Sequence, residues 1–115
     1  MSAQVVREPS DPEISAAAGL FKLLSDPTRL RIIWALLHGE HSVNELASHV
    51  GAQPPAVSQH LSKLRLAGVV NTRRDGNRIL YGSANEHVLA LTVEALRHAD
   101  HVVGGAVHHR KEQAS

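Results

Sequence analysis

The chain has 115 residues, no cysteine, and only one each of Phe, Trp and Tyr. This length predicts one domain with a modest core, for which a dimer interface would be a natural source of further stability. Leu, Val, Ile and Ala must fill that core, which favours helices. The missing cysteines exclude disulfides and thiolate metal sites and fit a reducing compartment. Because the sequence contains neither an apolar run of about eighteen residues nor a signal-peptide pattern, we expect a cytoplasmic protein without membrane contact.

The formal net charge of +1 conceals an uneven distribution of charge along the chain. Residues 1–52 carry four basic and six acidic side chains, residues 53–81 five and one, and residues 82–115 three and four. A basic patch confined to part of a small domain is typical of surfaces that contact nucleic-acid phosphates, although most charge runs are solvated surface. The middle segment is therefore the first candidate for a DNA-binding surface.

Apolar spacing predicts a first helix after a polar, proline-bearing stretch. Residues 1–12 are expected to form a flexible N-terminal arm, and a helix should follow from Glu13 to about Leu24. A second helix is expected to begin with Asp26 as its N-cap and Pro27 as its first residue, and to end at Gly39. Its predicted apolar face consists of Leu30, Ile33, Trp34 and Leu37.

Two further helices follow, separated by a tight turn. Ser42 and Glu45 form the pattern of a capping box, which predicts a short third helix that ends at Gly51. The fourth helix should run from Pro54 to Gly68. Its predicted buried residues are Val57, Leu61 and Leu64.

The period of the sequence then changes from helical to strand-like. Two β-prone runs flank Asp75–Gly76, and a DG pair between such runs is a strong hairpin signal. Ser83 and Glu86 form another capping-box pattern, which predicts a last helix that persists to about Val103. Residues 104–115 are expected to form a short polar tail that contains histidine.

A short helix, a tight turn, a second helix and a hairpin together predict a winged helix-turn-helix domain over residues 13–103. The fold class is thus mainly α with a small β-hairpin wing. The fourth helix would lie in the DNA major groove, with Ser58 and Gln59 near base edges and the later residues near phosphates. The hairpin arginines would contact the backbone or the minor groove. The predicted DNA-contacting residues are Ser58, Gln59, His60, Ser62, Lys63, Arg65, Arg73, Arg74 and Arg78.

In combination, the stretches DPTRLRI, ELA, AVSQHLSKLR and RRDGNRILY resemble the ArsR/SmtB family of metal-responsive winged-helix regulators. The likeness covers roughly residues 15–103. It implies a homodimer built mainly from the first and last helices, which binds double-stranded operator DNA and loses DNA affinity when metal binds. We therefore expect a repressor. The family's arsenic, lead and cadmium sensors carry a cysteine box in the third helix, where this chain has SVNELAS, so we do not expect those specificities.

Three histidines of the predicted last helix, His87, His98 and His101, share one face. At about 100° per residue they lie within roughly 60° of arc. Eleven residues at about 1.5 Å each place His87 and His98 roughly 16 Å apart, too far to share one ion with bonds near 2 Å. An antiparallel helix of a second protomer would bring His87 beside the partner's His98 and the partner's His101. The geometry therefore predicts two symmetric metal sites across a dimer interface.

The choice of metal follows from the resemblance to the family's last-helix sites, which have the pattern D-x-H followed ten residues later by H-x-x-E or H-x-x-H. The three histidines match this pattern, but Asn85 stands where an aspartate is expected. An uncharged amide would weaken a tetrahedral zinc site. A six-coordinate site could add ligands, as in the family's nickel and cobalt sensors, so we favour Ni(II) or Co(II), with Zn(II) as the alternative. The candidate additional ligands are Asp100, His108 and His109.

Two other functions remain open at this point. One is a winged-helix DNA-binding regulator that is independent of metal, in which the last-helix histidines serve only dimer packing. The other is a His-rich metal-buffering protein whose hairpin binds no DNA. We expect no enzymatic activity, because the sequence shows neither a catalytic nucleophile with a general base nor a phosphate-binding loop. The three remaining histidines before the basic segment, His38, His41 and His49, are expected to be surface residues.

Overall fold

The computed structural model describes the backbone of residues 7–114 and the side chains of residues 7–104. The fold is mainly helical with a two-stranded antiparallel hairpin, which confirms the expected class. Within the described residues no helix combines the length and the apolar character that a membrane crossing requires. The elements in chain order are α1 (Asp11–Leu24), α2 (Pro27–Leu36), α3 (Val43–Val50), α4 (Pro54–Leu66), β1 (Val70–Asp75), β2 (Arg78–Ser83) and α5 (Glu86–Ala114).

Local capping explains where the first three helices begin. The Asp26 side chain accepts hydrogen bonds from the backbone N–H groups of Thr28 and Arg29, as its predicted N-cap role requires. The predicted capping box of Ser42 and Glu45 is present in α3. A capping box that we did not predict, Ser10 with Glu13, starts α1 at Asp11, two residues earlier than expected.

The two ends of α5 differ from the prediction. Ser83 is the last residue of β2, and the Asn85 Oδ1 atom accepts from the backbone N–H groups of His87 and Val88, at 3.0 and 3.1 Å. The predicted capping box of Ser83 with Glu86 is therefore wrong, because an amide one residue before the helix satisfies the free donors. The predicted end near Val103 is also wrong, since the helical backbone continues to Ala114. Glycine inside a helix costs only about 1 kcal/mol relative to alanine, so the Gly-Gly pair weakens the helix without ending it.

The core lies between α2, α3, α4 and the base of the hairpin. The three residues predicted to be buried in α4, Val57, Leu61 and Leu64, are fully buried. The buried face of α2 is rotated from the prediction, because Ile32, Ile33 and Leu36 lie inside while Trp34 is 49% exposed. Val88 and Thr92 attach the first turns of α5 to this core.

The hairpin is extended by one residue of the loop between α2 and α3. Antiparallel pairing places Arg73 opposite Leu80 and Arg74 opposite Ile79, and Gly76 turns the chain with a φ of 64°. His41 forms an isolated bridge with Tyr81 through two backbone hydrogen bonds of 3.1 and 2.8 Å. The wing is therefore fastened to the start of α3, which fixes its position relative to the helices.

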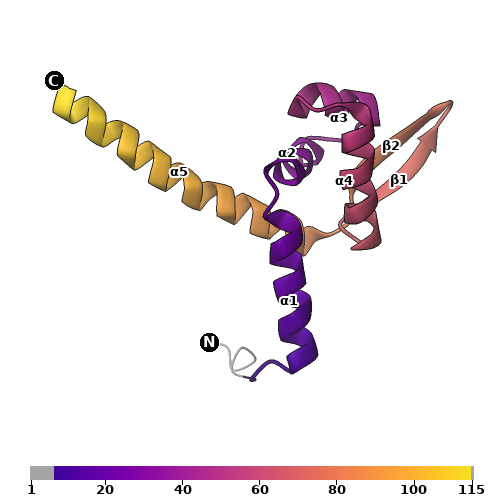
Figure 1. Ribbon diagram of the computed structural model, residues 1–115, viewed down its shortest axis with the longest axis horizontal. Helices are drawn as coiled ribbons and strands as arrows, with labels where there is room; N and C mark the ends of the chain where they lie inside the picture. The colour runs from indigo at the N-terminus through magenta and orange to yellow at the C-terminus, as the bar shows by residue number, and fades with distance from the viewer. Residues whose placement is uncertain (1–6, 115) are drawn as a thin grey trace.

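Two helices extend beyond this compact part of the molecule. Figure 1 shows α1 and α5 projecting from it in different directions. Every residue of α1 from Asp11 to Gly19, and every residue of α5 from Glu94 to Val103, is exposed. Several of the exposed side chains on these helices are large and apolar, which is unusual for a surface that remains in water. These side chains are Ile14, Phe21, Leu96, Val102 and Val103.

Candidate nucleic-acid interface and metal site

The outer face of α4 presents most of the side chains predicted to contact DNA. The helix buries one stripe in the core, so the residues between the stripe positions face solvent. Those that are exposed are Ser58, Gln59, Ser62, Lys63 and Arg65. His60 differs from them, because it is half-buried and its Nδ1 atom lies 3.2 Å from the Nη1 atom of Arg29 in α2. His60 therefore flanks the exposed face of α4.

The pleat of the hairpin separates the three wing arginines, which the sequence places together. Directly opposed residues of an antiparallel pair point to the same face, so Arg73 and Arg78 share the face of the buried Leu80. The Arg73 Nε atom donates to both carboxylate oxygens of Glu40, at 2.7 and 2.9 Å. The Arg78 Nη2 atom lies 2.9 Å from the Glu45 Oε1 atom. Arg73 is thus held by an acidic side chain in the loop before α3, and Arg78 by one in α3 itself.

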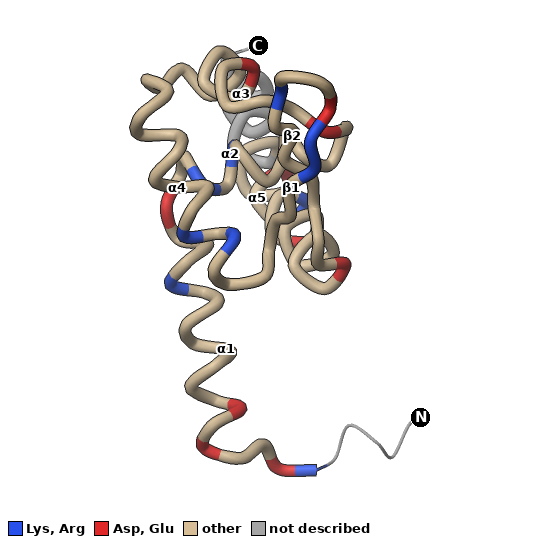
Figure 2. Tube along the Cα trace, turned by 90° about the vertical axis from the view of Figure 1, so that its right-hand side faces the viewer, with Lys and Arg blue, Asp and Glu red and all other residues tan. Residues whose placement is uncertain are grey.

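Arg74 lies on the opposite face of the hairpin. It is exposed, and among the described side chains no ion pair to it is recorded. Figure 2 shows basic positions on both strands of the wing, with an acidic position near its turn. All three predicted wing contacts are exposed, and Arg74 is the one whose charge is not paired with a carboxylate among the described side chains.

The two acidic partners of the wing arginines are held in their charged form. The hydrogen bond from Arg73 lowers the pKa of Glu40. The backbone N–H of Ser42, followed by the charge of Arg78, lowers the pKa of Glu45. Conversely, the pKa of Arg73 is raised by its hydrogen bond to Glu40. The wing is thus electrostatically tied to the loop before α3 and to α3 itself.

The predicted metal ligands of α5 are exposed but lie apart on one chain. His87, His98, His101 and Asp100 all face solvent. Among the side chains of residues 7–104, no three His, Asp or Glu groups converge closely enough to hold a metal ion. His108 and His109 lie on the helical backbone of α5, but their side chains are outside the described residues. A metal site shared between two α5 helices therefore stays a prediction.

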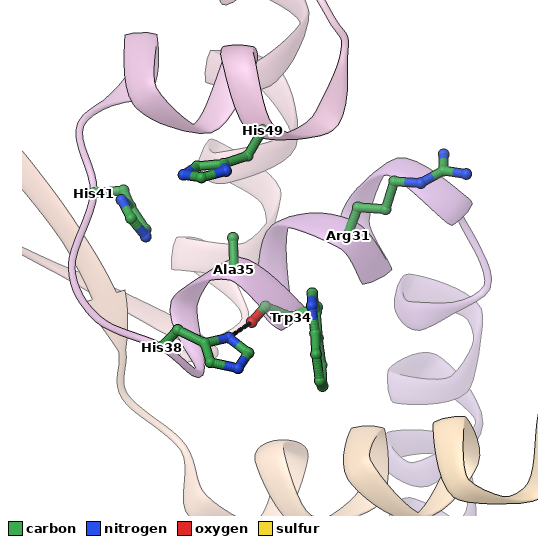
Figure 3. A pocket seen from close by; sticks show the side chains of 6 residues that line it. All are labelled: Arg31, Trp34, Ala35, His38, His41 and His49. Atoms are coloured by element: carbon green, nitrogen blue, oxygen red, sulfur yellow. Dashed lines mark hydrogen bonds between the residues drawn. The ribbon is translucent and has the colours of Figure 1, made fainter. Parts of the chain in front are cut away.

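A histidine cluster outside α5 was not predicted. His38, His41 and His49 line one pocket of about 520 Å³, together with Arg31, Trp34 and Ala35 (Figure 3). His38 and His49 are exposed as expected, whereas His41 is half-buried, and its ring centroid lies 4.9 Å from that of His49. The spacing of His41, Glu45 and His49, each four residues apart, is a signal in the sequence that could have indicated their proximity.

The comparisons with known proteins agree with this fold. Residues 26–72 match the family of bacterial regulatory proteins named for arsR. The transcriptional regulator KmtR of Mycobacterium tuberculosis is 45% identical over 101 residues, which cover 88% of this chain and 78% of KmtR. The chain belongs to the ArsR family. The transcriptional repressor SmtB of M. tuberculosis is 38% identical over 92 residues, covering 79% of the chain and 68% of SmtB.

The solved structures place this ArsR-family chain among winged-helix regulators. The homodimeric winged helix-turn-helix DNA-binding domain of a possible ArsR-family regulator from Mycobacterium bovis superposes with a TM-score of 0.72. It is 31% identical and covers 83% of this chain and 91% of its own. The ArsR-family chain is therefore a winged helix-turn-helix transcriptional regulator and not an enzyme, as the sequence predicted.

Proposed function

We propose that the protein is a homodimeric repressor that binds a palindromic operator and releases it when a metal ion binds between the two α5 helices. In this proposal α4 reads base edges in the major groove and Arg74 contacts the DNA backbone. The observation that carries the proposal is the combination of exposed apolar residues and exposed histidines on a helix that leaves the protein core.

A second copy of the chain is the partner that best suits α1 and α5. Phe21 of α1 lines an apolar cavity of about 220 Å³ with Leu30 of α2 and Leu91 of α5, so the bases of the two helices form one continuous apolar surface. Burying the exposed apolar side chains would contribute about 25 cal/mol per Å² of area removed from water. A homodimer relates such surfaces by a two-fold axis, and the M. bovis relative is homodimeric.

The donors on α5 suit a divalent ion with nitrogen and oxygen ligands. The three α5 histidines provide imidazole nitrogens, while Asn85 is engaged as the N-cap, so it cannot ligate without freeing two backbone N–H groups. Further ligands must then come from Asp100 or from the end of α5. A larger coordination shell of this kind favours Ni(II) or Co(II), with Zn(II) as the alternative.

The metal-independent regulator remains the second candidate. In it the exposed histidines of α5 would serve only the packing of the dimer. A metal buffer without DNA binding is less favoured, because it leaves the exposed face of α4 and the wing unexplained.

DNA binding with and without metal tests these alternatives. The preferred duplex is first selected from a random pool, and its affinity is then measured by fluorescence anisotropy with Ni(II), Co(II) or Zn(II). We expect metal to weaken binding by about 5- to 150-fold, the usual range of coupling between two sites. The double variant His87→Ala/His101→Ala should retain DNA binding but lose this response. Equal affinity with and without every metal would support the metal-independent regulator instead.

A further inference from the structure

We infer that Arg29 is a positioning residue for DNA binding, which fixes the tautomer of His60 so that the His60 Nε2–H group donates to a phosphate of the DNA. The hydrogen bond between the two side chains carries this inference. The inference rests on the proposed function, because it requires DNA to lie along α4, but it is independent of the metal response.

Arg29 is held at the end of α1 by a carbonyl oxygen that lacks its usual partner. In a continuous helix the Leu23 carbonyl oxygen would accept from the N–H group four residues later, but that residue is Pro27, which has no N–H. The Arg29 Nε atom donates to this oxygen instead, at 2.7 Å. Because the guanidinium nitrogens form a rigid fork, this bond also orients the other donors of the group.

The same guanidinium group determines which nitrogen of His60 carries the proton. The Arg29 Nη1 atom lies 3.2 Å from the His60 Nδ1 atom. A guanidinium group has only donors, so Nδ1 must be the acceptor in this hydrogen bond. A neutral imidazole that accepts at Nδ1 carries its proton at Nε2. The contact with Arg29 therefore selects the tautomer of His60 that is a donor on its other side.

The Nε2 atom of His60 reaches solvent at the edge of α4. Among the described side chains the hydrogen bond at Nδ1 is the only one recorded for this ring. No buried side-chain nitrogen or oxygen of the described residues lacks a partner, so the Nε2 atom is accessible. His60 is half-buried and directly follows the exposed Ser58 and Gln59. A free N–H donor thus lies beside the face of α4 that is proposed to read DNA.

A phosphate oxygen suits this donor better than a base edge. The His60 ring is held toward α2, so it cannot extend into a groove as far as the exposed side chains of Ser58 and Gln59. Side chains at the margin of a reading helix meet the sugar-phosphate backbone, which takes about half to two-thirds of protein–DNA hydrogen bonds. Phosphate oxygens only accept, so a proton at Nδ1 would leave a lone pair at Nε2 and no hydrogen bond.

The ring tautomer in the free protein tests the first step. Long-range nitrogen–proton correlation spectra distinguish a ring nitrogen with a proton from one with a lone pair, and loss of signals in His60→Gln identifies those of His60. In mildly alkaline buffer, where an unperturbed imidazole is neutral, we expect the lone pair at Nδ1 in the wild type and a mixture of tautomers in Arg29→Met. A wild-type proton at Nδ1, or a spectrum that Arg29→Met leaves unchanged, would overturn the inference.

Two amide variants of His60 test the phosphate contact by fluorescence anisotropy without metal. The amide of Gln reaches the position of Nε2, whereas that of Asn reaches only the position of Nδ1. His60→Asn should therefore weaken DNA binding by roughly 10- to 100-fold, the contribution of one hydrogen bond to a charged group, and His60→Gln should weaken it less. The loss should be similar for every DNA sequence. Equal losses in the two variants, or a changed sequence preference, would contradict the phosphate contact.

A double-variant cycle determines whether Arg29 acts through His60. Arg29→Met removes the donors and keeps a long side chain, so it should weaken DNA binding in the wild type. In the His60→Asn background it should have little effect, because no imidazole remains to be oriented. Equal effects in both backgrounds would mean that Arg29 acts independently of His60, and the inference would be wrong.

Arg31→Met is the matched control for Arg29→Met. Arg31 is exposed and lies about 200° around α2 from Arg29, so its replacement should leave the His60 tautomer unchanged. Circular dichroism verifies folding, and if Arg29→Met does not fold, the wild-type tautomer and the two His60 variants still decide the inference. A wild-type chain that binds no duplex contradicts the proposed function itself. Wild-type binding that none of the Arg29 and His60 variants weakens contradicts only this inference.

Discussion

Arg78 of the wing and Glu45 of α3 form an ion pair of 2.9 Å, and the same carboxylate oxygen accepts the backbone N–H of Ser42 that caps α3. One acidic side chain thus takes part in the capping box at the start of α3 and also holds the hairpin against that helix. The neighbouring pair of Arg73 with Glu40 makes a second connection between the wing and the loop before α3. The orientation of the wing is therefore set partly by two carboxylates, which under the proposed function would compete with DNA phosphates for the arginines.

Arg74→Ala should weaken DNA binding for every sequence tested. Arg74 is exposed without a recorded acidic partner in the described part of the chain, so its loss removes about one phosphate contact and lowers the salt slope by roughly one. Affinity measured at several salt concentrations checks this. Arg97→Ala, on α5, is the control and should leave the slope unchanged. A salt slope that Arg74→Ala does not alter would contradict a role for this residue at the DNA backbone.

Glu40→Gln should increase the affinity for DNA by a similar factor for every DNA sequence. The exchange removes the charge that holds Arg73, so that the guanidinium becomes available to a phosphate. The same anisotropy assay should show higher affinity and a steeper dependence on salt. The matched control is Glu94→Gln, which breaks the exposed pair with Arg97 far from the wing. If the two glutamine variants behave alike, the pair of Glu40 with Arg73 does not restrain DNA binding.

The cap of α2 should make folding stability depend on pH. Hydrogen bonds from the backbone N–H of Arg29 and then of Thr28 lower the pKa of Asp26 from its usual 3.8. A lowered carboxyl pKa in the folded state adds stability above pH 3.8 that is lost as the pH falls through the lower folded value. Asn can still cap the helix but does not titrate. The difference in Tm between wild type and Asp26→Asn should therefore shrink in this acidic range, and a constant difference would contradict the assignment.

Removing residues 107–115 should reduce the affinity for Ni(II) or Co(II) more than that for Zn(II). A six-coordinate ion needs ligands beyond the three α5 histidines, and His108 and His109 are the nearest histidines that follow them. Calorimetric titration of each ion compares the truncated and full chains. The double variant His108→Ala/His109→Ala removes the two imidazoles but keeps the rest of the segment. It therefore distinguishes the contribution of these rings to metal affinity from that of the other removed residues. Equal losses for all three metals would show that the tail binds metal without completing a specific site.

The elements of this fold could be predicted because their signals are local. Asp26, the Ser42 capping box and the Asp75–Gly76 turn specify their own boundaries within a few residues. The wing ion pairs could not be predicted in this way, since Arg73 and Glu40 are 33 residues apart in sequence. The start of α5 was misplaced because Ser83 and Asn85 both suit a cap, and only the length of β2 decides between them.

The candidate sites were predicted unevenly for the same reason. The outward face of α4 follows from helical period, and so does the shared stripe of the α5 histidines. The exposure of Trp34 was missed, because a large apolar side chain is usually placed inside when only one chain is considered. The contact between the rings of His41 and His49 depends on how the loop before α3 folds back toward that helix. The prediction that each histidine is a separate surface residue did not take this loop into account.

A mixed dimer tests most directly whether the α5 metal site is shared between protomers. One chain carries His87→Ala and the other His98→Ala/His101→Ala, and the heterodimer is isolated with two affinity tags after coexpression. Each variant homodimer lacks both complete sites, whereas the heterodimer keeps one site with His87 from one chain and His98 with His101 from the other. We predict two ions for the parent dimer, none for either homodimer and one for the heterodimer; a heterodimer as empty as the homodimers, or homodimers that still bind two ions, would contradict the account.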